Sequence, residues 1–507
     1  MIYVHVPFCR SFCTYCDFYS EVAARCRKAE DVLKQEKLFE EFSQALCAEA
    51  VSRAGEISDE VNTLYIGGGT PSVLPLSALR KILDTLALLG HGMPGSSKDI
   101  SGLVVKGPSS SSHAGQGLSW AGRPYDEFTV EVNPEDIIEK GHAYVEGLLE
   151  LGVNRISMGV QSFDDSVLKF MNRRHTAAEA VRAYAILEES GVRNISIDLI
   201  FGLPQLSMSQ WRETLDKALA ISSRGVLPQH ISSYQLSVEP GSMLARLVEK
   251  GRWSEAPEEV CQEQYAELCS VLASAGYNHY EISNFARPGY EARHNSAYWS
   301  HTPYVGLGPG AHSFVSGHSM ASFDSPLCPS IDSPHCPSID SPLCPSSDYL
   351  HCPSNDSLHC SSIDSPHCPS IDSHYCHFER PKGVEKSFRR TWNLPDLQTY
   401  LDAFRHGDFS SVREGETLTM DQLTLEHIML GLRTSSGLPA SYLRTHCTPA
   451  ALSRALSLGH LVPVPESVAS LAPAASHESL ASLPAGCHLR IPERHFFISD
   501  AIISALV

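Results

Sequence analysis

The chain has 507 residues, of which 42% are hydrophobic and 19% are charged, and its formal net charge at pH 7 is -19. This composition is typical of a globular protein, and no apolar run is long enough to predict a stable membrane span. The acidic balance argues against a nucleic-acid partner, because a protein that neutralises phosphates needs a basic face.

From the start to about residue 240, short β-branched runs alternate with helical patterns at the rhythm of βα units. The six predicted strands cover residues 2–7, 62–69, 127–134, 154–162, 194–204 and 230–240. The sequence therefore predicts an α/β fold, a partial (β/α)6 barrel of parallel strands, whose active site is expected at the carboxyl ends of the strands.

Three cysteines, Cys9, Cys13 and Cys16, directly follow the first predicted strand. No secretory signal precedes them, which favours metal or redox chemistry over disulfides. A [4Fe–4S] cluster usually takes four thiolates, so three leave one iron open. An open iron can chelate the amino and carboxylate groups of S-adenosylmethionine (SAM), and Tyr15 could stack on its adenine. The alternatives are a zinc loop, to which His5 could supply a fourth ligand, and a chance clustering of cysteines.

Polar residues recur at or just past the ends of the predicted strands. The run "GGGTP" follows the second strand, and its glycines would let the backbone approach a ligand. Ionised side chains at this rim could hold the ammonium, ribose hydroxyls and carboxylate of the cofactor. Each one alone is equally well explained as a salt bridge or cap, but a shared rim favours binding. The candidates beyond the glycine run are Glu131, Gln161, Arg173 and Asp198.

Two segments look foreign to this core. Residues 91–124 are rich in Ser and Gly and are predicted to form a disordered insertion. Within residues 324–377, a cysteine recurs every eight positions from Cys328 to Cys376, in units such as "CPSIDSPH". We interpret this repeat as a disordered loop, because short metal sites usually space their ligands two to four residues apart; metal capture is the alternative.

The domain boundaries follow from these segments. Residues 1–320 are predicted to form the barrel and its extension, and residues 380–507 a smaller C-terminal domain that is mainly helical or winged-helix-like.

The chain carries a series of motifs, which include "YVHVPFCRSFCTYCDF", "YIGGGTPS", "EVNPE", "RISMGVQSF" and "HNSAYWSHTPYVGLGPGAHSF". In this order they resemble the radical SAM superfamily, in particular its oxygen-independent coproporphyrinogen oxidase family. The resemblance implies that the three cysteines bind the cluster. It further implies that SAM contacts Tyr3, Gly68, Gly69, Thr70, Glu131, Gln161, Arg173 and Asp198.

Two features resemble the HemW-type haem chaperone branch of that family. Asp17 and Phe18 follow the third cysteine, where the decarboxylating members carry Gly-Cys. The run "HNSAYW" at residues 294–299 is associated in that branch with haem binding, so His294 would ligate haem iron between flat walls made by Tyr298 and Trp299. Without the resemblance, a histidine beside aromatic residues is more often structural.

The resemblance implies a haem chaperone with a [4Fe–4S] cluster, SAM and haem as cofactors. Its partners would be haem, acceptor haemoproteins and an electron donor, and a homodimer is left open. The rival hypothesis is an enzyme that uses a 5′-deoxyadenosyl radical to decarboxylate coproporphyrinogen III, and a third is a redox scaffold that binds neither SAM nor tetrapyrrole. The expected compartment is the cytoplasm, or the mitochondrion if a leader is missing.

Overall fold

The computed structural model describes residues 1–22, 29–57, 61–90, 125–316, 388–464, 483–484 and 486–507. These belong to one compact unit, Met1–Ser319 with Ser387–Val507. The segments 91–124 and 324–377 lie outside the described residues, so the predictions made for them, and the predicted domain boundaries, stay predictions.

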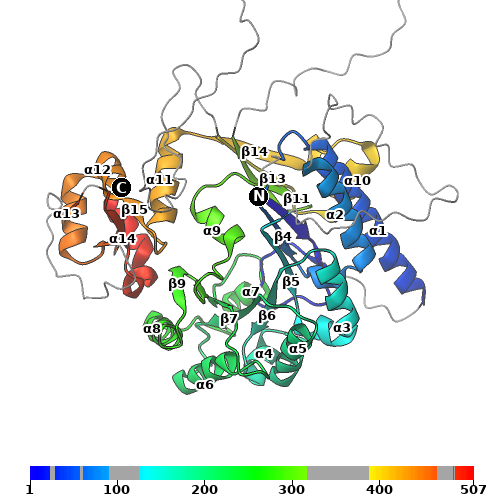
Figure 1. Ribbon diagram of the computed structural model, residues 1–507, viewed down its shortest axis with the longest axis horizontal. Helices are drawn as coiled ribbons and strands as arrows, with labels where there is room; N and C mark the ends of the chain where they lie inside the picture. The colour runs from blue at the N-terminus through cyan, green and yellow to red at the C-terminus, as the bar shows by residue number, and fades with distance from the viewer. Residues whose placement is uncertain (23–28, 58–60, 91–124, 317–387, 465–482, 485) are drawn as a thin grey trace, which may run out of the picture. The chain divides into compact units, whose positions relative to one another are not determined.

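A nine-stranded mixed sheet organises the chain (Figure 1). All six predicted strands are present, and each is parallel to its neighbour along the chain. They are β1 (Ile2–Val6), β4 (Thr63–Gly68), β5 (Glu127–Val132), β6 (Arg155–Gln161), β7 (Ile195–Phe201) and β8 (His230–Gln235). The outer edges are β11 (Val305–Leu307), parallel to β1, and the antiparallel pair β9 (Asn278–Glu281) and β10 (Asn284–Ala286).

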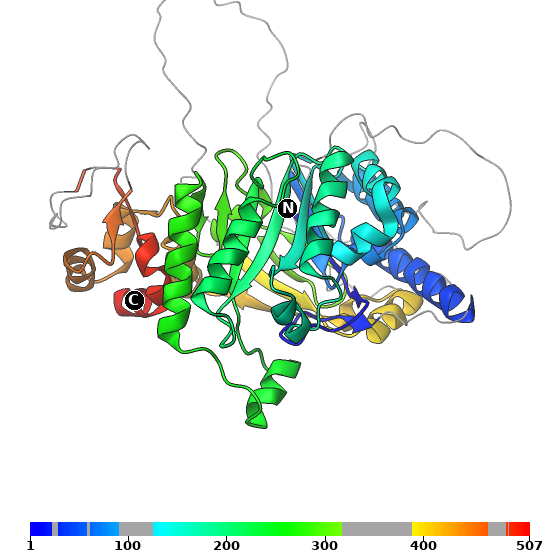
Figure 2. The same cartoon turned by 90° about the horizontal axis from the view of Figure 1, so that it is seen from below.

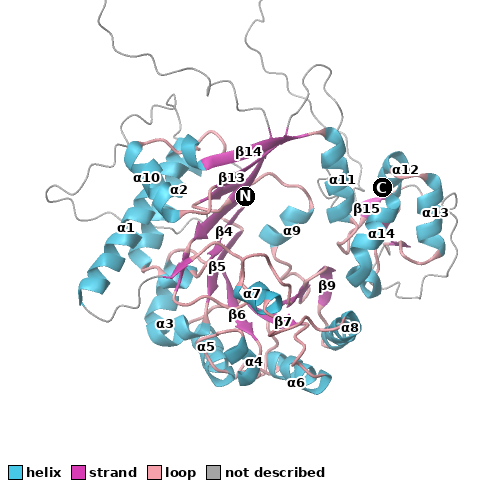
Figure 3. Cartoon of the chain, turned by 180° about the vertical axis from the view of Figure 1, so that it is seen from behind, coloured by secondary structure: helices cyan, strands magenta, loops and turns pink. Residues whose placement is uncertain are grey.

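Helices connect successive strands and lie along one side of the sheet, as Figures 2 and 3 show. They are α1 (Ala29–Ser52), α2 (Leu76–Gly90), α3 (Pro134–Glu150), α4 (Asp165–Phe170), α5 (Ala177–Glu189) and α6 (Met208–Leu219). Local signals fix where they begin: Thr176 and Ser207 each form a capping box at the start of α5 and α6. The predicted alternation of strand and helix is confirmed.

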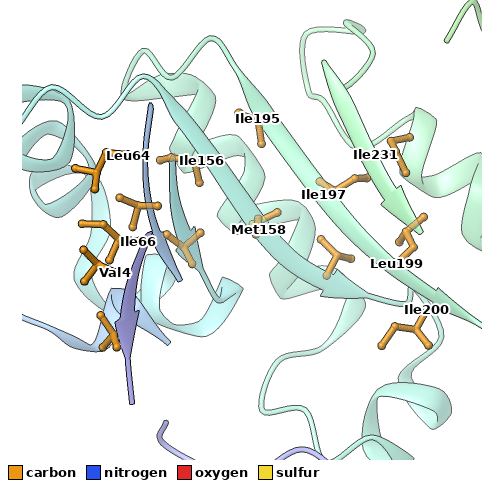
Figure 4. Close-up of a cluster of buried hydrophobic side chains, with 14 of the residues drawn as sticks. Val4, Leu64, Ile66, Ile156, Met158, Ile195, Ile197, Leu199, Ile200 and Ile231 are labelled. Atoms are coloured by element: carbon orange, nitrogen blue, oxygen red, sulfur yellow. The ribbon is translucent and has the colours of Figure 1, made fainter. Parts of the chain in front are cut away.

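The two faces of the sheet differ in chemistry because alternate residues of a strand point to opposite sides. One set is apolar and packs into the core, as Figure 4 shows for Ile66, Ile156, Ile197 and Ile231. The other set, on the same strands, is mostly polar. The side of the sheet away from the core can therefore line a binding site.

The remaining helices and strands follow the barrel. They are α7 (Met243–Glu249), α8 (Glu258–Ser274), α9 (Arg293–Trp299), α10 (Leu397–His406), α11 (Met420–Gly431), α12 (Ala440–His446), α13 (Pro449–Ser457) and α14 (Ser499–Leu506). A three-stranded antiparallel sheet joins β12 (His312–Ser316), β13 (Phe388–Asn393) and β14 (Arg413–Leu418). A smaller one, among α11 to α14, joins β15 (Leu438–Pro439), β17 (His488–Arg490) and β16 (Val462–Pro463).

This architecture confirms the predicted fold class, a partial α/β barrel followed by a mainly helical part with a small sheet. None of the helices in the described ranges is long and apolar enough to cross a membrane.

Candidate functional site

The cysteine loop leaves β1 and is held from three sides. The short strands β2 (Phe8–Cys9) and β3 (Glu21–Val22) pair across its base. The backbone amide of Thr14 donates to the carbonyl of Met171 at 3.2 Å, and the Thr14 carbonyl accepts from the amide of Leu244 at 2.8 Å. The Asn172 side chain donates to the carbonyl of Phe12 at 2.6 Å. These bonds fix the loop before any ligand binds.

A cavity of about 600 Å³ lies between this loop and the polar face of the sheet. Except for Trp299, the residues predicted from the sequence to bind cluster, SAM or haem line it: Tyr3, Cys9, Cys13, Tyr15, Cys16, Gly68, Gly69, Thr70, Glu131, Gln161, Arg173, Asp198, His294 and Tyr298. We refer to it as the cysteine cavity. Its volume lies in the range of small-molecule and cofactor sites.

The three cysteines are free and half-buried. Burial raises the pKa of Cys9, and burial together with the nearby Cys13 raises the pKa of Cys16 to about 12. Cys9 Sγ lies 3.5 Å from Thr70 Oγ1. The Cys9 and Cys16 thiols are therefore protonated at neutral pH until a metal displaces their protons.

Arg173 connects the cysteine loop to the sheet. Its guanidinium donates to Cys13 Sγ at 3.4 Å, to Asn133 Oδ1 at 2.6 Å and to the Gly159 carbonyl at 2.8 Å. Asn133 in turn donates from Nδ2 to Thr70 Oγ1 at 3.1 Å. A fixed positive charge thus lies beside one of the three cysteine sulfurs that are predicted to bind the cluster.

Glu131 lies next to the end of β5 and is held by two donors. The Tyr65 hydroxyl donates to Oε1 at 2.6 Å, and the Gly68 amide donates to Oε2 at 3.2 Å. Burial raises the pKa of Glu131 to about 7, and Asp198 acts in the same direction, whereas these two hydrogen bonds oppose the shift. The carboxyl group therefore titrates near neutral pH.

Asp198 corrects one expectation. It was predicted at a strand end, but it is the fourth residue of β7 and accepts from Ser157 Oγ at 3.1 Å. Burial raises its pKa, while Arg155 and Ser157 lower it. Arg155 and His230, the first residues of β6 and β8, line the same cavity. The cavity therefore extends along the inner face of the sheet instead of being confined to the rim.

The glycine run has a packing role that its sequence did not reveal. A Cβ atom at Gly68 would lie 2.6 Å from the His5 ring, and one at Gly69 would lie 2.8 Å from the Phe8 carbonyl. Gly68 also has a φ of 104°, which side chains disfavour. These glycines let β4 end against the start of the cysteine loop, and their backbone lines the cavity.

Gln161 has a φ of 67°, in the left-handed region that non-glycine residues rarely adopt. The pairing of β6 with β7 shifts register between Gly159 and Gln161. Such a bulge redirects a side chain next to a site, and the strain is retained where function requires it.

His5 does not join the cysteines. Its Nδ1 is hydrogen-bonded to the Tyr3 hydroxyl at 3.0 Å and its Nε2 to the Tyr19 carbonyl at 2.8 Å. It is buried, and it lines a second cavity instead of the cysteine cavity. Both ring nitrogens are engaged, so this arrangement does not support His5 as a fourth zinc ligand.

His294 is only 1% exposed, and both of its ring nitrogens are also engaged. Nδ1 lies 2.8 Å from Thr63 Oγ1, and Nε2 lies 3.0 Å from the Tyr298 hydroxyl. Burial lowers the pKa of His294 to about 3. Trp299, the second predicted wall, is absent from the lining of the cysteine cavity. His294 would have to break its bond to Tyr298 before Nε2 could bind iron.

The donor set fits an iron–sulfur cluster with SAM. The buried Nε atoms of Arg155 and Arg173, two residues that line the cavity, have no hydrogen-bond partner among the described residues. Buried polar atoms usually have a hydrogen-bond partner, so these two atoms are free to donate to a bound ligand or to water. In the part of the chain that the structure describes, no three His, Cys, Asp or Glu side chains are gathered to hold one metal ion. A cubane, unlike zinc, takes each thiolate at a separate corner.

Sequence reasoning missed several residues of this cavity, namely Tyr65, Asn133, Arg155, Ser157 and His230. A signal was present, because Arg155, Ser157 and Gly159 alternate with apolar residues along β6. Such alternation is unusual in a parallel strand covered on both faces and indicates a polar interior.

Comparison with known proteins is consistent with this geometry. Residues 3–218 match the model of the Radical SAM superfamily. Similar curated proteins are "Heme chaperone HemW" of Synechocystis sp., 34% identical over 62% of this chain and 66% of its own length, and of Bacillus subtilis, 33% identical over 62% and 71%. "Radical S-adenosyl methionine domain-containing protein 1, mitochondrial" of Danio rerio is 32% identical over 62% of this chain and 61% of its own length. The chain thus matches about two thirds of the length of these relatives.

A solved structure shares this fold. Coproporphyrinogen III oxidase (HemN) from Escherichia coli, described as a radical SAM enzyme, covers 99% of this chain and 89% of its own, with a TM-score of 0.60 and 17% identity. At this identity, the likeness concerns the fold alone.

Proposed function

The chain belongs to the radical SAM superfamily, in the HemN-like group that includes the HemW proteins, and from this membership we propose that it is a haem chaperone. It would bind haem, with a [4Fe–4S] cluster and SAM as resident cofactors, and pass the haem to acceptor haemoproteins. The observation that carries the proposal is identity of 33–34% to curated proteins named haem chaperones. Asp17 and Phe18, in place of Gly-Cys after the third cysteine, support the same branch.

When bound, a [4Fe–4S] cluster with one open iron would anchor SAM and supply it with an electron. Cys9, Cys13 and Cys16 would hold the cluster. Arg173 would stabilise the Cys13 thiolate through its bond at 3.4 Å, and its unpartnered Nε would be available to a polar ligand. Roles of this kind would explain the presence of a half-buried guanidinium beside the cysteines.

The polar inner face of the sheet would orient SAM. Glu131, held by Tyr65 and Gly68, would accept from the ammonium or ribose hydroxyls of the cofactor. Asp198 is positioned by Ser157 for a similar acceptor role. Tyr3, Tyr15, Gly69, Thr70 and Gln161 complete the proposed contacts.

The rival function is decarboxylation of coproporphyrinogen III. The chain shares its fold with the bacterial oxidase, and a shared fold is compatible with this function. The experiment that separates the two functions uses full-length protein reconstituted with iron and sulfide without oxygen. One portion is titrated with haem and followed by absorbance. A second portion is incubated with SAM, a reductant and coproporphyrinogen III, and the products are separated by chromatography.

We expect haem to bind at one equivalent per chain, with no protoporphyrinogen formed. Formation of protoporphyrinogen over repeated turnovers would replace the chaperone with the enzyme. Absence of haem binding would also refute the chaperone proposal.

The relatives named above include bacterial proteins and one named as mitochondrial. We therefore propose that the chain acts in the bacterial cytoplasm or in the mitochondrion, according to its source.

A further inference from the structure

A second cavity of about 560 Å³ lies beside the cysteine cavity. It is lined by Tyr3, His5, Asp17, Phe18, Tyr19, Tyr298, Tyr304, Gly310, His312, Trp392, Asn393 and Pro395. Eight of these twelve residues carry an aromatic ring, so we call it the aromatic cavity. Its volume suits a flat organic ligand, and its walls suit an apolar one.

The rings of the aromatic cavity are ordered by contact with one another. His312 stacks on Trp392 with ring centroids 6.0 Å apart and planes inclined by 26°. Tyr298 meets Tyr304 edge-on at 4.8 Å. The strand pairing that places His312 opposite Trp392, between β12 and β13, fixes the first of these pairs. Rigid aromatic walls of this kind lose little entropy when a ligand binds.

The histidines near the two cavities differ in whether their ring nitrogens are engaged in hydrogen bonds. His5 and His294 are buried, and each has both ring nitrogens in hydrogen bonds. His312 is exposed at the surface of the aromatic cavity, and its ring has no hydrogen-bond or ion-pair partner among the residues that the structure describes. An imidazole with a free nitrogen is the common protein ligand of haem iron.

Resting on the proposed function, we propose that the aromatic cavity is the haem site of this chain and that His312 is the axial ligand of the haem iron. Phe18, Tyr304 and Trp392 form the apolar walls around the macrocycle. His294 is then a positioning residue: it holds the Tyr298 hydroxyl at 3.0 Å and so fixes one wall. The motif "HNSAYW" serves the haem site through Tyr298 instead of through direct coordination.

Asp17 and Phe18, which directly follow the cysteine loop, line both cavities, as do Tyr3 and Tyr298. The haem site and the proposed SAM site therefore share a wall.

The test is a haem titration of the full-length, reconstituted protein, followed by the position and amplitude of the Soret band. His312→Ala is expected to shift the band and to weaken haem binding by a factor of about 10 or more, the loss typical of a damaged metal site. Added imidazole is expected to restore the band of this variant. His142→Ala, an exposed histidine that lines neither cavity, is the matched control and is expected to match the unsubstituted protein.

Iron content and SAM binding of His312→Ala are expected to be unchanged, because its ring bonds to no other described residue. His294→Ala is expected to keep the spectrum of a histidine-ligated haem. A normal Soret band in His312→Ala would overturn the assignment, and so would loss of the ligand signature in His294→Ala alone. If the unsubstituted protein binds no haem, the proposed function itself fails, which distinguishes the two failures.

Discussion

Glu131, which is half-buried, and Glu281, which is buried, both have a pKa raised to about 7, in each case mainly by desolvation. Only Glu131 lines the cysteine cavity; Glu281 bonds instead to Asn284, Ser283 and Asn295. Comparing variants of these two glutamates therefore distinguishes the effect of a titrating carboxyl on stability from its effect on ligand binding.

The sign of the pH effect follows from linkage. Between the ordinary pKa of 4.5 and the folded value of about 7, the folded state holds a proton that the unfolded state has lost. The stability contribution is full below pH 4.5, falls as the pH rises to about 7, and is constant above that. The shift corresponds to at most about 3 kcal/mol per glutamate.

Glu131→Gln is therefore expected to remove part of the pH dependence of the free energy of unfolding, measured by urea denaturation of the cluster-free protein. Glu281→Gln should change the same dependence. Only Glu131→Gln should weaken SAM binding to the reconstituted protein. Curves for Glu131→Gln that run parallel to those of the unsubstituted protein would contradict the raised pKa.

For single residues, the sequence predicted which side chains line the cysteine cavity better than it predicted their hydrogen bonds. Glu131 and Asp198 were recognised as carboxylates on predicted strands. Arg155 was missed, because an arginine at a strand start is common and its unpartnered Nε is visible only in three dimensions. His294 was recognised as a motif residue, but its bond to Thr63, 231 positions away, has no local signal.

The turn between β4 and the 3₁₀ helix Pro71–Val73 packs against the start of the cysteine loop. The Gly69 amide donates to the Val6 carbonyl at 2.8 Å, and a Cβ atom at Gly69 would lie 2.9 Å from that oxygen. No side chain fits there without moving the loop.

Gly69→Ala is expected to lower the free energy of unfolding by about 1–3 kcal/mol, the usual cost of overpacking, and to reduce iron loading. The control is Gly191→Ala, where no atom lies within 4 Å but φ is 96°. It should cost about 1–2 kcal/mol through backbone strain while leaving iron loading intact. Equal iron loading in the two variants would show that the glycine run does not position the loop.

The strands themselves were predictable because β-branched runs and turn residues mark them. Their ends were less so. The predicted strand 194–204 stops at Phe201, because Gly202 has a φ of 80° and turns the chain. The polar inner face of the sheet could not be predicted from the sequence. An alternating pattern along one strand does not show which set of side chains faces the core until the strands are aligned in a sheet.

Across the whole molecule, Glu49 on α1 connects parts of the chain that lie on either side of residues 317–387. Its fully buried carboxylate accepts from the Gly308 amide at 2.8 Å, from Asn393 Nδ2 at 2.7 Å and from the Tyr400 hydroxyl at 2.7 Å. Arg413 also donates to it at 3.4 Å.

Glu49→Ala leaves these donors buried without their acceptor. We expect a loss of about 3–5 kcal/mol in the free energy of unfolding, the range found when one partner of a buried ion pair is removed. Glu146→Ala, an exposed glutamate on α3, should change it by less than about 0.5 kcal/mol. Denaturant titration measures both, and a Glu49 variant as stable as the Glu146 variant would contradict this central role.

This long-range network could not be predicted, because Glu49 lies in a helical pattern where a glutamate normally faces solvent. The sequence did predict that globular structure resumes after the repeat. It did not predict that β13 returns to pair with β12, since the register of strands 72 or more positions apart carries no local signal.

The most direct test of the account is the metal centre itself. After anaerobic reconstitution, we predict about four iron and four sulfide per chain, and a paramagnetic resonance spectrum of the reduced protein that changes when SAM is added. Cys13→Ala should lose this signal, while Cys447→Ala, a buried cysteine outside the cavity, should keep it. Zinc in place of iron, or an iron spectrum that SAM leaves unchanged, would contradict the account.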